Sequence, residues 1–336
     1  MFFSPITSNE TKDASQIIDP QAITTIPEAA SRPILVSGAH RTGTTWVGKM
    51  LSATPATAYI SEPLNVLHRP GVFAAKTTRW YTYICPDNEN NYLPAFQNLL
   101  RLDYGLWREL GSIHSRKDLG RFVRDAWIFG SGKLRRARPL IKDPFAIFSL
   151  GWFIERLGCQ VVVTVRHPAA FVSSLKRLDW PFDLNDLLQQ PYLMRDWLEP
   201  FRTEIDRALS SSTDELLQAG LLWRLVYSVV AEYSRIYPQI RIVRHEPLSL
   251  DPLHGFQELY KDLGLDFTER ARQSVLASSS VENPQELSKK TVHAVQLDSR
   301  ANLANWKKRL SAQEILRIRR QTEDVASLYY AEEDWL

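Results

Sequence analysis

The sequence predicts an α/β fold in which helices flank a parallel sheet. Short apolar runs rich in β-branched residues, such as residues 34–36 and 161–165, are typical of strands that are buried on both faces. Segments with helical periodicity separate these runs, and this alternation indicates a parallel sheet of about four or five strands. The chain has 336 residues, of which 44% are hydrophobic and 24% charged, an ordinary composition for a globular protein.

The predicted elements begin at residue 33. Strands are expected at residues 34–36, 58–60, 140–141, 161–165 and 240–243, and helices at residues 44–51, 213–237 and 312–330. The fourth strand is the clearest, because it is β-branched throughout and is bounded by Gly158 and Pro168. The last helix begins with a capping box, in which Ser311 precedes Glu314 by three residues.

A single domain is predicted for residues 31–336. Residues 1–30 are polar and interrupted by Pro20 and Pro27, so we expect them to form an N-terminal extension. Residues 67–138 are aromatic and polar and have few strand signals. We therefore expect residues 67–138 to be a mainly helical cap, a substrate-binding insertion that covers the ligand edge of the sheet.

Charge and cysteine content exclude several classes of protein. With 41 Lys and Arg residues against 38 Asp and Glu residues, the net charge of +3 argues against a nucleic-acid partner. Two cysteines, Cys85 and Cys159, are too few for a disulfide scaffold or a four-cysteine zinc site. Neither a signal peptide nor an apolar stretch long enough to span a membrane is evident, so a cytoplasmic protein with no membrane span is expected.

The loop after the first strand has the composition of an anion-binding site. Gly38 and Gly43 have the spacing of a nucleotide-triphosphate loop, whose amide groups and helix N-terminus hold phosphate. Thr44 replaces the usual lysine, and the cation lies inside the loop at Arg41. The strand at 161–165 ends in Arg166, where a triphosphate enzyme would need an Asp to organise Mg²⁺. These replacements predict an anion site that works without a metal ion.

Two segments resemble the signatures of sulfotransferases that use 3′-phosphoadenosine 5′-phosphosulfate (PAPS). The run Arg41-Thr42-Gly43-Thr44-Thr45-Trp46 is similar to their 5′-phosphosulfate loop. Arg166 and Ser174 have the spacing of their 3′-phosphate site. The resemblance covers residues 33–63, 140–178 and 240–330 and implies a P-loop NTPase-like sulfotransferase fold of bacterial type. It implies that PAPS is the donor, that adenosine 3′,5′-bisphosphate is the product, and that the residues of both segments bind the nucleotide.

Sulfuryl transfer also needs a cation for the leaving phosphate oxygen and a base for the acceptor hydroxyl. Arg41 and the loop amide groups can supply donors to the sulfuryl oxygens. The resemblance assigns the leaving group to Lys142, which lies 24 residues before Arg166. Cytosolic members of the family carry a histidine base two residues after this lysine, where this chain has Pro144. That departure leaves the base to be found elsewhere.

A second branch of the family, which includes tyrosylprotein sulfotransferases, uses a glutamate about twenty residues beyond the loop. Glu62 has this position, directly after the strand predicted at 58–60, and is our candidate for the general base. The alternative is a strand-end carboxylate that forms an ion pair with Arg41 or Arg69. Asp143 is a rival by sequence, but an Asp before a proline is typical of a helix N-cap.

Other features leave the function open. His245 stands where the family often has a tyrosine near the adenine, so the adenine contact is undefined. Cations between Arg300 and Lys308 resemble the family's last block, which closes over the 3′-phosphate, and the basic run 133–138 is predicted to be a solvated turn. The acceptor, whether a saccharide, a lipid or a small molecule, and the oligomeric state are not indicated. Alternative functions are a P-loop kinase or nucleotide hydrolase, and a nucleotide-binding protein without catalysis.

Overall fold

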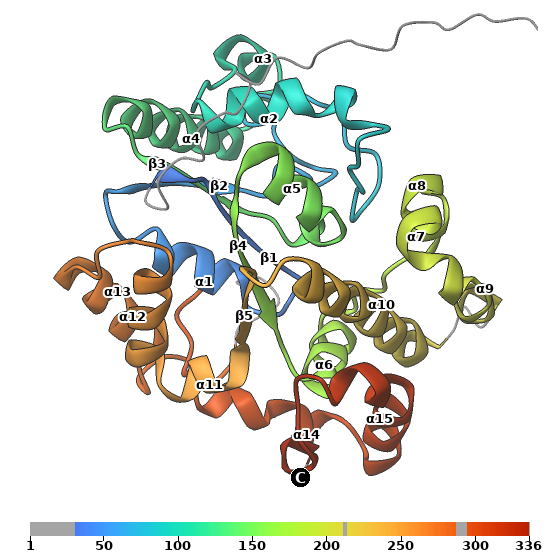
Figure 1. Cartoon of the computed structure of the whole chain (residues 1–336). Coiled ribbons are helices and arrows are strands. Elements are labelled where there is room, and N and C mark those ends of the chain that lie inside the picture. The colour runs from blue at the N-terminus through green and yellow to red at the C-terminus, as the bar shows by residue number, and fades with distance from the viewer. Residues whose placement is uncertain (1–30, 211–213, 287–293, 336) are drawn as a thin grey trace, which may run out of the picture.

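A five-stranded parallel sheet forms the centre of the computed structural model, with the strand order β2-β3-β1-β4-β5 (Figure 1). The structure describes residues 31–210, 214–286 and 294–335, so the predicted N-terminal extension at 1–30 lies outside the described residues. The strands are β1 (Ile34–Gly38), β2 (Thr57–Ser61), β3 (Arg138–Lys142), β4 (Gln160–Val165) and β5 (Arg241–Arg244). The α/β class and the parallel sheet predicted from the sequence are therefore confirmed.

All five predicted strands are present, with small differences at their ends. Strands β1 to β4 extend beyond the predicted residues, and β5 lies one residue later than predicted. The extensions include polar residues such as Arg138 and Lys142, which join the ladder because their backbones pair with neighbouring strands. A search for apolar runs cannot detect these residues, since the pairing involves backbone groups.

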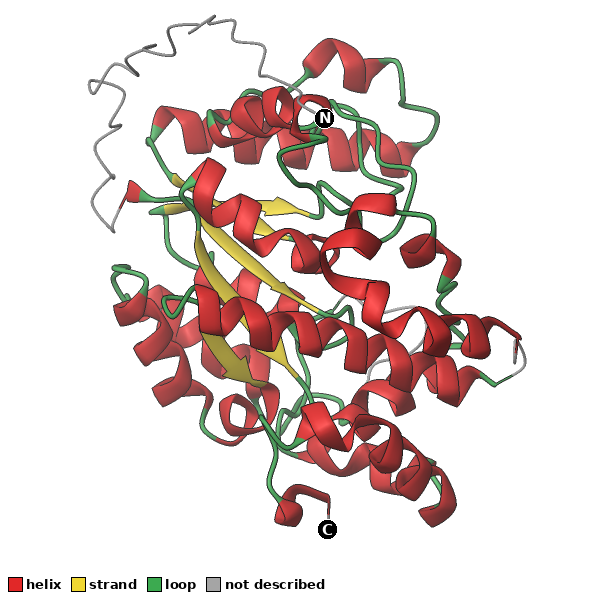
Figure 2. Cartoon of the chain, turned by 45° about the vertical axis from the view of Figure 1, so that its right-hand side comes forward, coloured by secondary structure: helices red, strands yellow, loops and turns green. Residues whose placement is uncertain are grey.

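Both faces of the sheet are covered by helices, as Figure 2 shows. Ile34 and Val36 of β1 belong to one apolar core, and Leu35 belongs to the other, as the alternation of side chains along a strand requires. The first core is completed by α1 (Thr44–Leu51), α12 (Pro252–Asp262) and α13 (Glu269–Ser279). The second is completed by α5 (Leu150–Leu157), α6 (Pro168–Leu178), α10 (Glu215–Ile236) and α15 (Ala312–Ala326).

The three predicted helices are present, with differences at their ends. Helix α10 runs from Glu215 to Ile236 within the predicted range 213–237, of which residue 213 lies outside the described residues. Helix α1 has the predicted bounds, and α15 has the predicted capping box. Helix α15 ends at Ala326 and not at residue 330, because the backbone N–H groups of Leu328 and Tyr329 donate to carbonyls three residues earlier, at Val325 and Ala326, in tight turns. Outside the cap, the other α-helices of the described residues are α7 (Asn185–Leu188), α8 (Pro191–Leu193), α9 (Arg202–Ser210), α11 (His245–Leu250) and α14 (Asn305–Arg309).

The segment predicted as a cap, residues 67–138, consists of helices and irregular loops, and its last residue, Arg138, is the first residue of β3. It contains η3 (Glu89–Asn91), α2 (Leu93–Leu100), α3 (Leu106–Leu110) and α4 (Arg116–Leu134). Helix α4 lies so close to β2 that a Cβ on Gly132 would be 2.9 Å from the Ala58 Cβ. The cap also reaches the loop after β1, since the Tyr81 hydroxyl accepts a 3.2 Å hydrogen bond from the backbone N–H of His40.

Short helical turns complete the described structure. They are η4 (Pro144–Ser149), the π-helical turn η5 (Met194–Leu198), η6 (Glu199–Phe201), η7 (Ala301–Ala304) and η8 (Glu332–Trp335). Cys85 and Cys159 are buried free thiols, and burial raises the pKa of Cys159 to about 12, as expected for a packing residue. Within the described ranges no helix has the length and apolar character needed to cross a bilayer.

Candidate active site

The parallel sheet brings the predicted site residues to one edge. Gly38 at the end of β1 pairs with Thr164 of β4, and Val36 pairs with Lys142 at the end of β3. Arg166 therefore follows β4 next to the loop that follows β1. The strand order reverses at β1, and in open α/β sheets the crevice at such a point is the usual ligand site.

The backbone of the loop between β1 and α1 depends on glycine. Gly38 has φ +148°, and a Cβ there would lie 2.5 Å from the Thr164 carbonyl oxygen. Gly43 has φ +98° and forms the N-cap of α1, so no side chain caps this helix. The amide groups of Thr44 and Thr45 thus begin the helix without an intrahelical acceptor and are available to an anion.

Thr42 differs from the other loop residues in its orientation. Its hydroxyl donates to the Ala39 carbonyl at 2.6 Å and contacts the Thr164 hydroxyl at 2.8 Å. The side chain is fully buried, and Thr42 does not line the cavity described below. Thr42 was predicted to bind the nucleotide, but its side chain instead stabilises the loop by bonding to Ala39 and Thr164.

A cavity lies beside the loop and contains the remaining residues of both predicted phosphate signatures. It is lined by Arg41, Gly43, Thr44, Thr45, Trp46, Arg166, Ser174, Arg177, His245, Ser249, Ser278, Glu286, Ala294, Val295, Leu297, Ser299, Asn302 and Arg309. Four of these residues carry a guanidinium group, whereas Glu286 is the one carboxylate in the lining that the structure describes. The cavity has the charge expected of a site for an anion with several negative charges.

Electrostatic repulsion within the cavity supports this interpretation. Burial, followed by the charges of Arg166 and Arg177, lowers the pKa of Arg41 to about 10. Burial also lowers the pKa of Arg166, whose Nε is buried and has no hydrogen-bond partner among the described residues. Unpaired buried donors are rare in folded proteins. A bound anion would accept hydrogen bonds from these donors and relieve their repulsion.

Two serines of α6 face these arginines. The Ser174 hydroxyl accepts a 3.4 Å hydrogen bond from Arg41 Nε, and the Ser173 hydroxyl accepts one of 3.5 Å from Arg309. Arg166 donates to the Arg41 carbonyl oxygen at 3.2 Å. The structure thus brings together Arg41, Arg166 and Ser174, which lie in two separate segments of the sequence.

Sequence reasoning missed Arg177 and Arg309. Arg177 follows Ser174 by three residues, so helical spacing places both on one face of α6 and could have identified it. Arg309 lies directly after the predicted block that ends at Lys308. In that block, Arg300 donates instead to the Leu250 carbonyl at 2.9 Å, and Lys308 is exposed.

Aromatic residues border the cavity near the start of α1. The indole N–H of Trp46 donates to the Ser278 hydroxyl at 2.8 Å, and its ring contacts the edge of His245 at 5.9 Å between centroids. Burial lowers the pKa of His245 well below its usual value, so this imidazole is neutral at physiological pH. Both rings line the cavity and offer apolar surface to a purine.

Gly43 permits a test of the loop geometry. A Cβ at residue 43 would lie 2.9 Å from Nδ1 of the buried His245 ring, in a backbone conformation that L-residues avoid. We expect Gly43→Ala to weaken binding of adenosine 3′,5′-bisphosphate about tenfold and to lower the thermal midpoint by several degrees, because the strain costs about 1–2 kcal/mol. Gly130→Ala is the control, since nothing lies within 4 Å of its added Cβ. Unchanged affinity in Gly43→Ala, measured by calorimetry, would contradict this account of the loop.

Glu62 and Lys142 form an ion pair at the ends of β2 and β3. The Lys142 side chain is 2% exposed and that of Glu62 is 23% exposed. Burial acts to lower the pKa of Lys142, but the nearby Tyr59 and Glu62 outweigh it and the pKa is raised. Asn65 donates a 2.7 Å hydrogen bond to the second carboxylate oxygen of Glu62. The carboxylate is therefore held from both sides.

Neither residue of this ion pair belongs to the described lining of the arginine cavity. Burial and the charge of Arg41 lower the pKa of His40 to about 4, while the charge of Glu62 opposes them, so both groups lie near this imidazole. The Lys142 stem passes beside α1, where a Cβ on Gly48 would lie 2.9 Å from Lys142 Cγ. The pair thus lies near both the loop and the first helix.

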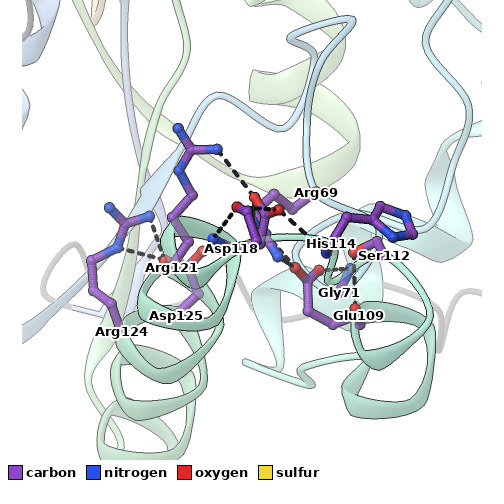
Figure 3. Close-up of polar contacts among 10 residues, drawn as sticks. Arg69, Gly71, Glu109, Ser112, His114, Asp118, Arg121, Arg124 and Asp125 are labelled. Carbon is purple, nitrogen blue, oxygen red and sulfur yellow. Dashed lines mark hydrogen bonds and ion pairs between the residues drawn. The ribbon is translucent and has the colours of Figure 1, made fainter.

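Asp143, the rival candidate for the base, and Arg69, the rival ion-pair partner of Glu62, have other contacts in the structure. Asp143 is fully buried, and its carboxylate accepts from the backbone N–H of Phe145 at 2.9 Å and from that of Leu64 at 2.6 Å, as expected for the predicted N-cap. Arg69, which was an alternative ion-pair partner for Glu62, instead pairs with Glu109 and Asp118 (Figure 3). Lys142, at the end of a strand, pairs with Glu62 in the described structure, and no ion pair between Glu62 and Arg69 is seen there.

A model of the sulfotransferase family matches residues 33–269, which is more than half of the chain. In a search of curated proteins, no sequence matches the chain. Solved structures that are similar include the sulfotransferase domain of the Synechococcus PCC 7002 olefin synthase, with 17% identity, a TM-score of 0.41, and coverage of 88% of this chain and 94% of that chain. Sulfotransferase STF9 from Mycobacterium avium is also similar, with 13% identity, a TM-score of 0.44, and coverage of 90% and 78%. Mouse sulfotransferase SULT7A1, solved with PAP, has 11% identity, a TM-score of 0.39, and coverage of 89% and 87%.

Proposed function

The chain belongs to the sulfotransferase family, and from this premise we propose how its residues divide the reaction. The enzyme transfers a sulfuryl group from PAPS to a hydroxyl group of an acceptor and releases adenosine 3′,5′-bisphosphate. Arg41, Arg166 and Ser174 bind the phosphate groups of the donor. Lys142 stabilises the leaving oxygen, and Glu62 accepts the proton of the acceptor hydroxyl. The acceptor is a small molecule, a saccharide or a lipid.

The observation that carries this proposal is the convergence of four arginines on one cavity beside the loop. PAPS carries a 3′-phosphate and a 5′-phosphosulfate, and two anionic groups require more than one cation. Arg166 has an unpartnered buried Nε, which is the donor that a phosphate oxygen would occupy. The amide groups at the start of α1 supply further donors for the second anionic group.

The reacting groups follow from the arrangement around Glu62. The acceptor oxygen attacks sulfur as the bond between sulfur and the bridging phosphate oxygen breaks, and the electron pair of that bond remains on the product nucleotide. The hydroxyl proton passes to the Glu62 carboxylate, which Asn65 and Lys142 hold in one orientation. Lys142 lies beside this carboxylate and is our candidate to stabilise the developing charge on the leaving oxygen.

A P-loop kinase or hydrolase is the alternative that this site favours less. Such an enzyme needs a lysine in the loop and an acidic residue for Mg²⁺. This chain has Thr44 and Arg166 at those positions, and both line the cavity. A cation in place of the acid disfavours a bound divalent ion through charge repulsion.

Calorimetry of nucleotide binding tests the proposed donor site. We expect adenosine 3′,5′-bisphosphate to bind with the same affinity in the presence and absence of EDTA, because arginines and amide groups supply all of the binding. ATP with Mg²⁺ should bind at least about tenfold more weakly, since loss of one charge-assisted hydrogen bond alone has this effect. Loss of bisphosphate binding in EDTA, or Mg²⁺-dependent ATP turnover, would support the kinase or hydrolase instead. Bisphosphate binding without sulfuryl transfer to any acceptor in a panel would indicate a protein without catalysis.

A further inference from the structure

Helix α4 presents apolar side chains to solvent on the face opposite its buried side. Phe129 of this helix is buried in the core. Leu119, Val123 and Trp127 follow one another at intervals of four residues and are 51%, 57% and 72% exposed. Leu134 at the end of the helix is 86% exposed, and helical geometry places it on the same side. We refer to Leu119, Val123, Trp127 and Leu134 as the α4 stripe.

Basic residues surround the α4 stripe. Residues 116–136 contain seven Lys or Arg residues and two Asp residues. Both acidic residues are already paired, Asp118 with Arg69 and Arg121, and Asp125 with Arg124 (Figure 3). The exposed residues Arg116 and Lys117 have no ion pair within the part of the chain that the structure describes. The surface around the stripe is therefore strongly cationic.

The neighbouring helix α3 is fixed to α4 and is also apolar on its exposed side. Arg69 forms ion pairs with Glu109 of α3 and with Asp118 of α4, and the backbone N–H of Gly71 donates to Glu109 at 2.8 Å (Figure 3). Glu109 is fully buried, whereas Arg69 and Asp118 are partly exposed, so the α3 end of this link is shielded from solvent. Trp107 of α3 is 87% exposed. The apolar side chains of both helices are thus presented in the folded state without a conformational change.

We propose that the α4 stripe docks this protein onto an anionic lipid bilayer. A helix with an apolar face that contains tryptophan, flanked by Lys and Arg, has the composition of helices that lie in a membrane interface. The basic residues would contact anionic head groups, while Val123 and Trp127 would enter the boundary of the acyl chains. A second copy of the chain is a poor occupant, because pairing two α4 stripes would bring the cationic borders together. This docking does not depend on the proposed sulfuryl transfer.

Vesicle cosedimentation with the full chain tests the proposal. We expect binding to vesicles of equal molar parts phosphatidylcholine and phosphatidylserine, with weaker binding at high salt and little binding to phosphatidylcholine alone. The double variant Val123→Ser/Trp127→Ser should bind at least about tenfold more weakly because it removes the inserted apolar groups. Arg116→Glu/Lys117→Glu should lose a similar factor, since each basic residue near an anionic surface contributes to binding.

Matched controls separate docking from general effects on folding or charge. Leu328→Ser removes a similarly exposed apolar residue after α15, and Lys261→Glu/Arg320→Glu reverses two exposed charges outside the cap. Both controls should bind vesicles as the unmodified chain does, and all variants should retain its thermal midpoint within a few degrees. No binding to the anionic vesicles, or equal binding by the α4 variants and the controls, would overturn the proposal. A dimer in light scattering that Trp127→Ser abolishes, without vesicle binding, would assign the stripe to a second copy.

Discussion

Arg41→Ala is expected to weaken binding of adenosine 3′,5′-bisphosphate by about 10²-fold or more and to nearly abolish sulfuryl transfer. Arg41 lies in the loop after β1, lines the cavity and contacts Ser174, so its guanidinium is directed at the proposed nucleotide. Charge-assisted hydrogen bonds contribute about 1.5–3 kcal/mol each, and a guanidinium makes more than one to a phosphate group. Calorimetry with the bisphosphate and a sulfuryl-transfer assay measure the two effects.

The thermal midpoint of Arg41→Ala distinguishes a role of Arg41 in nucleotide binding from a role in stabilising the fold. The charges of Arg166 and Arg177 oppose the Arg41 charge in the cavity, so removing Arg41 relieves repulsion in the ligand-free protein. We expect the thermal midpoint of Arg41→Ala to be equal to or higher than that of the unmodified chain. Arg202→Ala is the control, because Arg202 forms an exposed pair with Glu199 and should affect neither binding nor turnover. Tight bisphosphate binding by Arg41→Ala would exclude this loop as the donor site.

Glu62→Gln is expected to lower turnover by about 10²-fold or more while it leaves bisphosphate affinity nearly unchanged. The amide keeps the shape of the side chain and an oxygen that accepts from Lys142, but it cannot take the proton of the acceptor hydroxyl. Glu62 lies outside the described cavity lining, which is why donor binding should persist. Steady-state turnover with saturating donor, together with calorimetry, measures this separation.

A structural role for Glu62 predicts a different result. If the carboxylate only neutralised the buried Lys142, Glu62→Gln would lower the thermal midpoint and leave the shape of the pH–rate profile unchanged. A general base predicts loss of the acidic limb of that profile. Glu155→Gln is the matched control, because Glu155 is exposed and bonds only the Tyr237 hydroxyl in the described structure. Turnover equal to that of the unmodified chain would show that Glu62 is not the base.

Local signals were sufficient to predict most of the helices and strands and to identify the glycine loop for which we propose a role in phosphate binding. The strand at 34–38, the glycine loop and helix α1 are adjacent in the sequence, and each depends on contacts between near neighbours. The spacing of Arg166 and Ser174 on a strand end and a helix was likewise visible in one short segment. The inward orientation of the Thr42 side chain was not visible in the sequence, because it depends on a contact with Thr164 of β4, which is 122 residues away.

The sequence alone determined the α/β class, the order of the strands along the chain and the two short motifs, since these depend on periodicity and residue type. Only the tertiary structure decided which distant groups share one environment. Glu62 meets Lys142 across 80 positions because β2 and β3 are paired in parallel register. Arg309 reaches the cavity from the C-terminal region. Helix α4 turns an apolar face outward, while Phe129 and Gly132 on its other side pack in the interior. Such neighbours are set by the packing of whole elements, which no local pattern encodes.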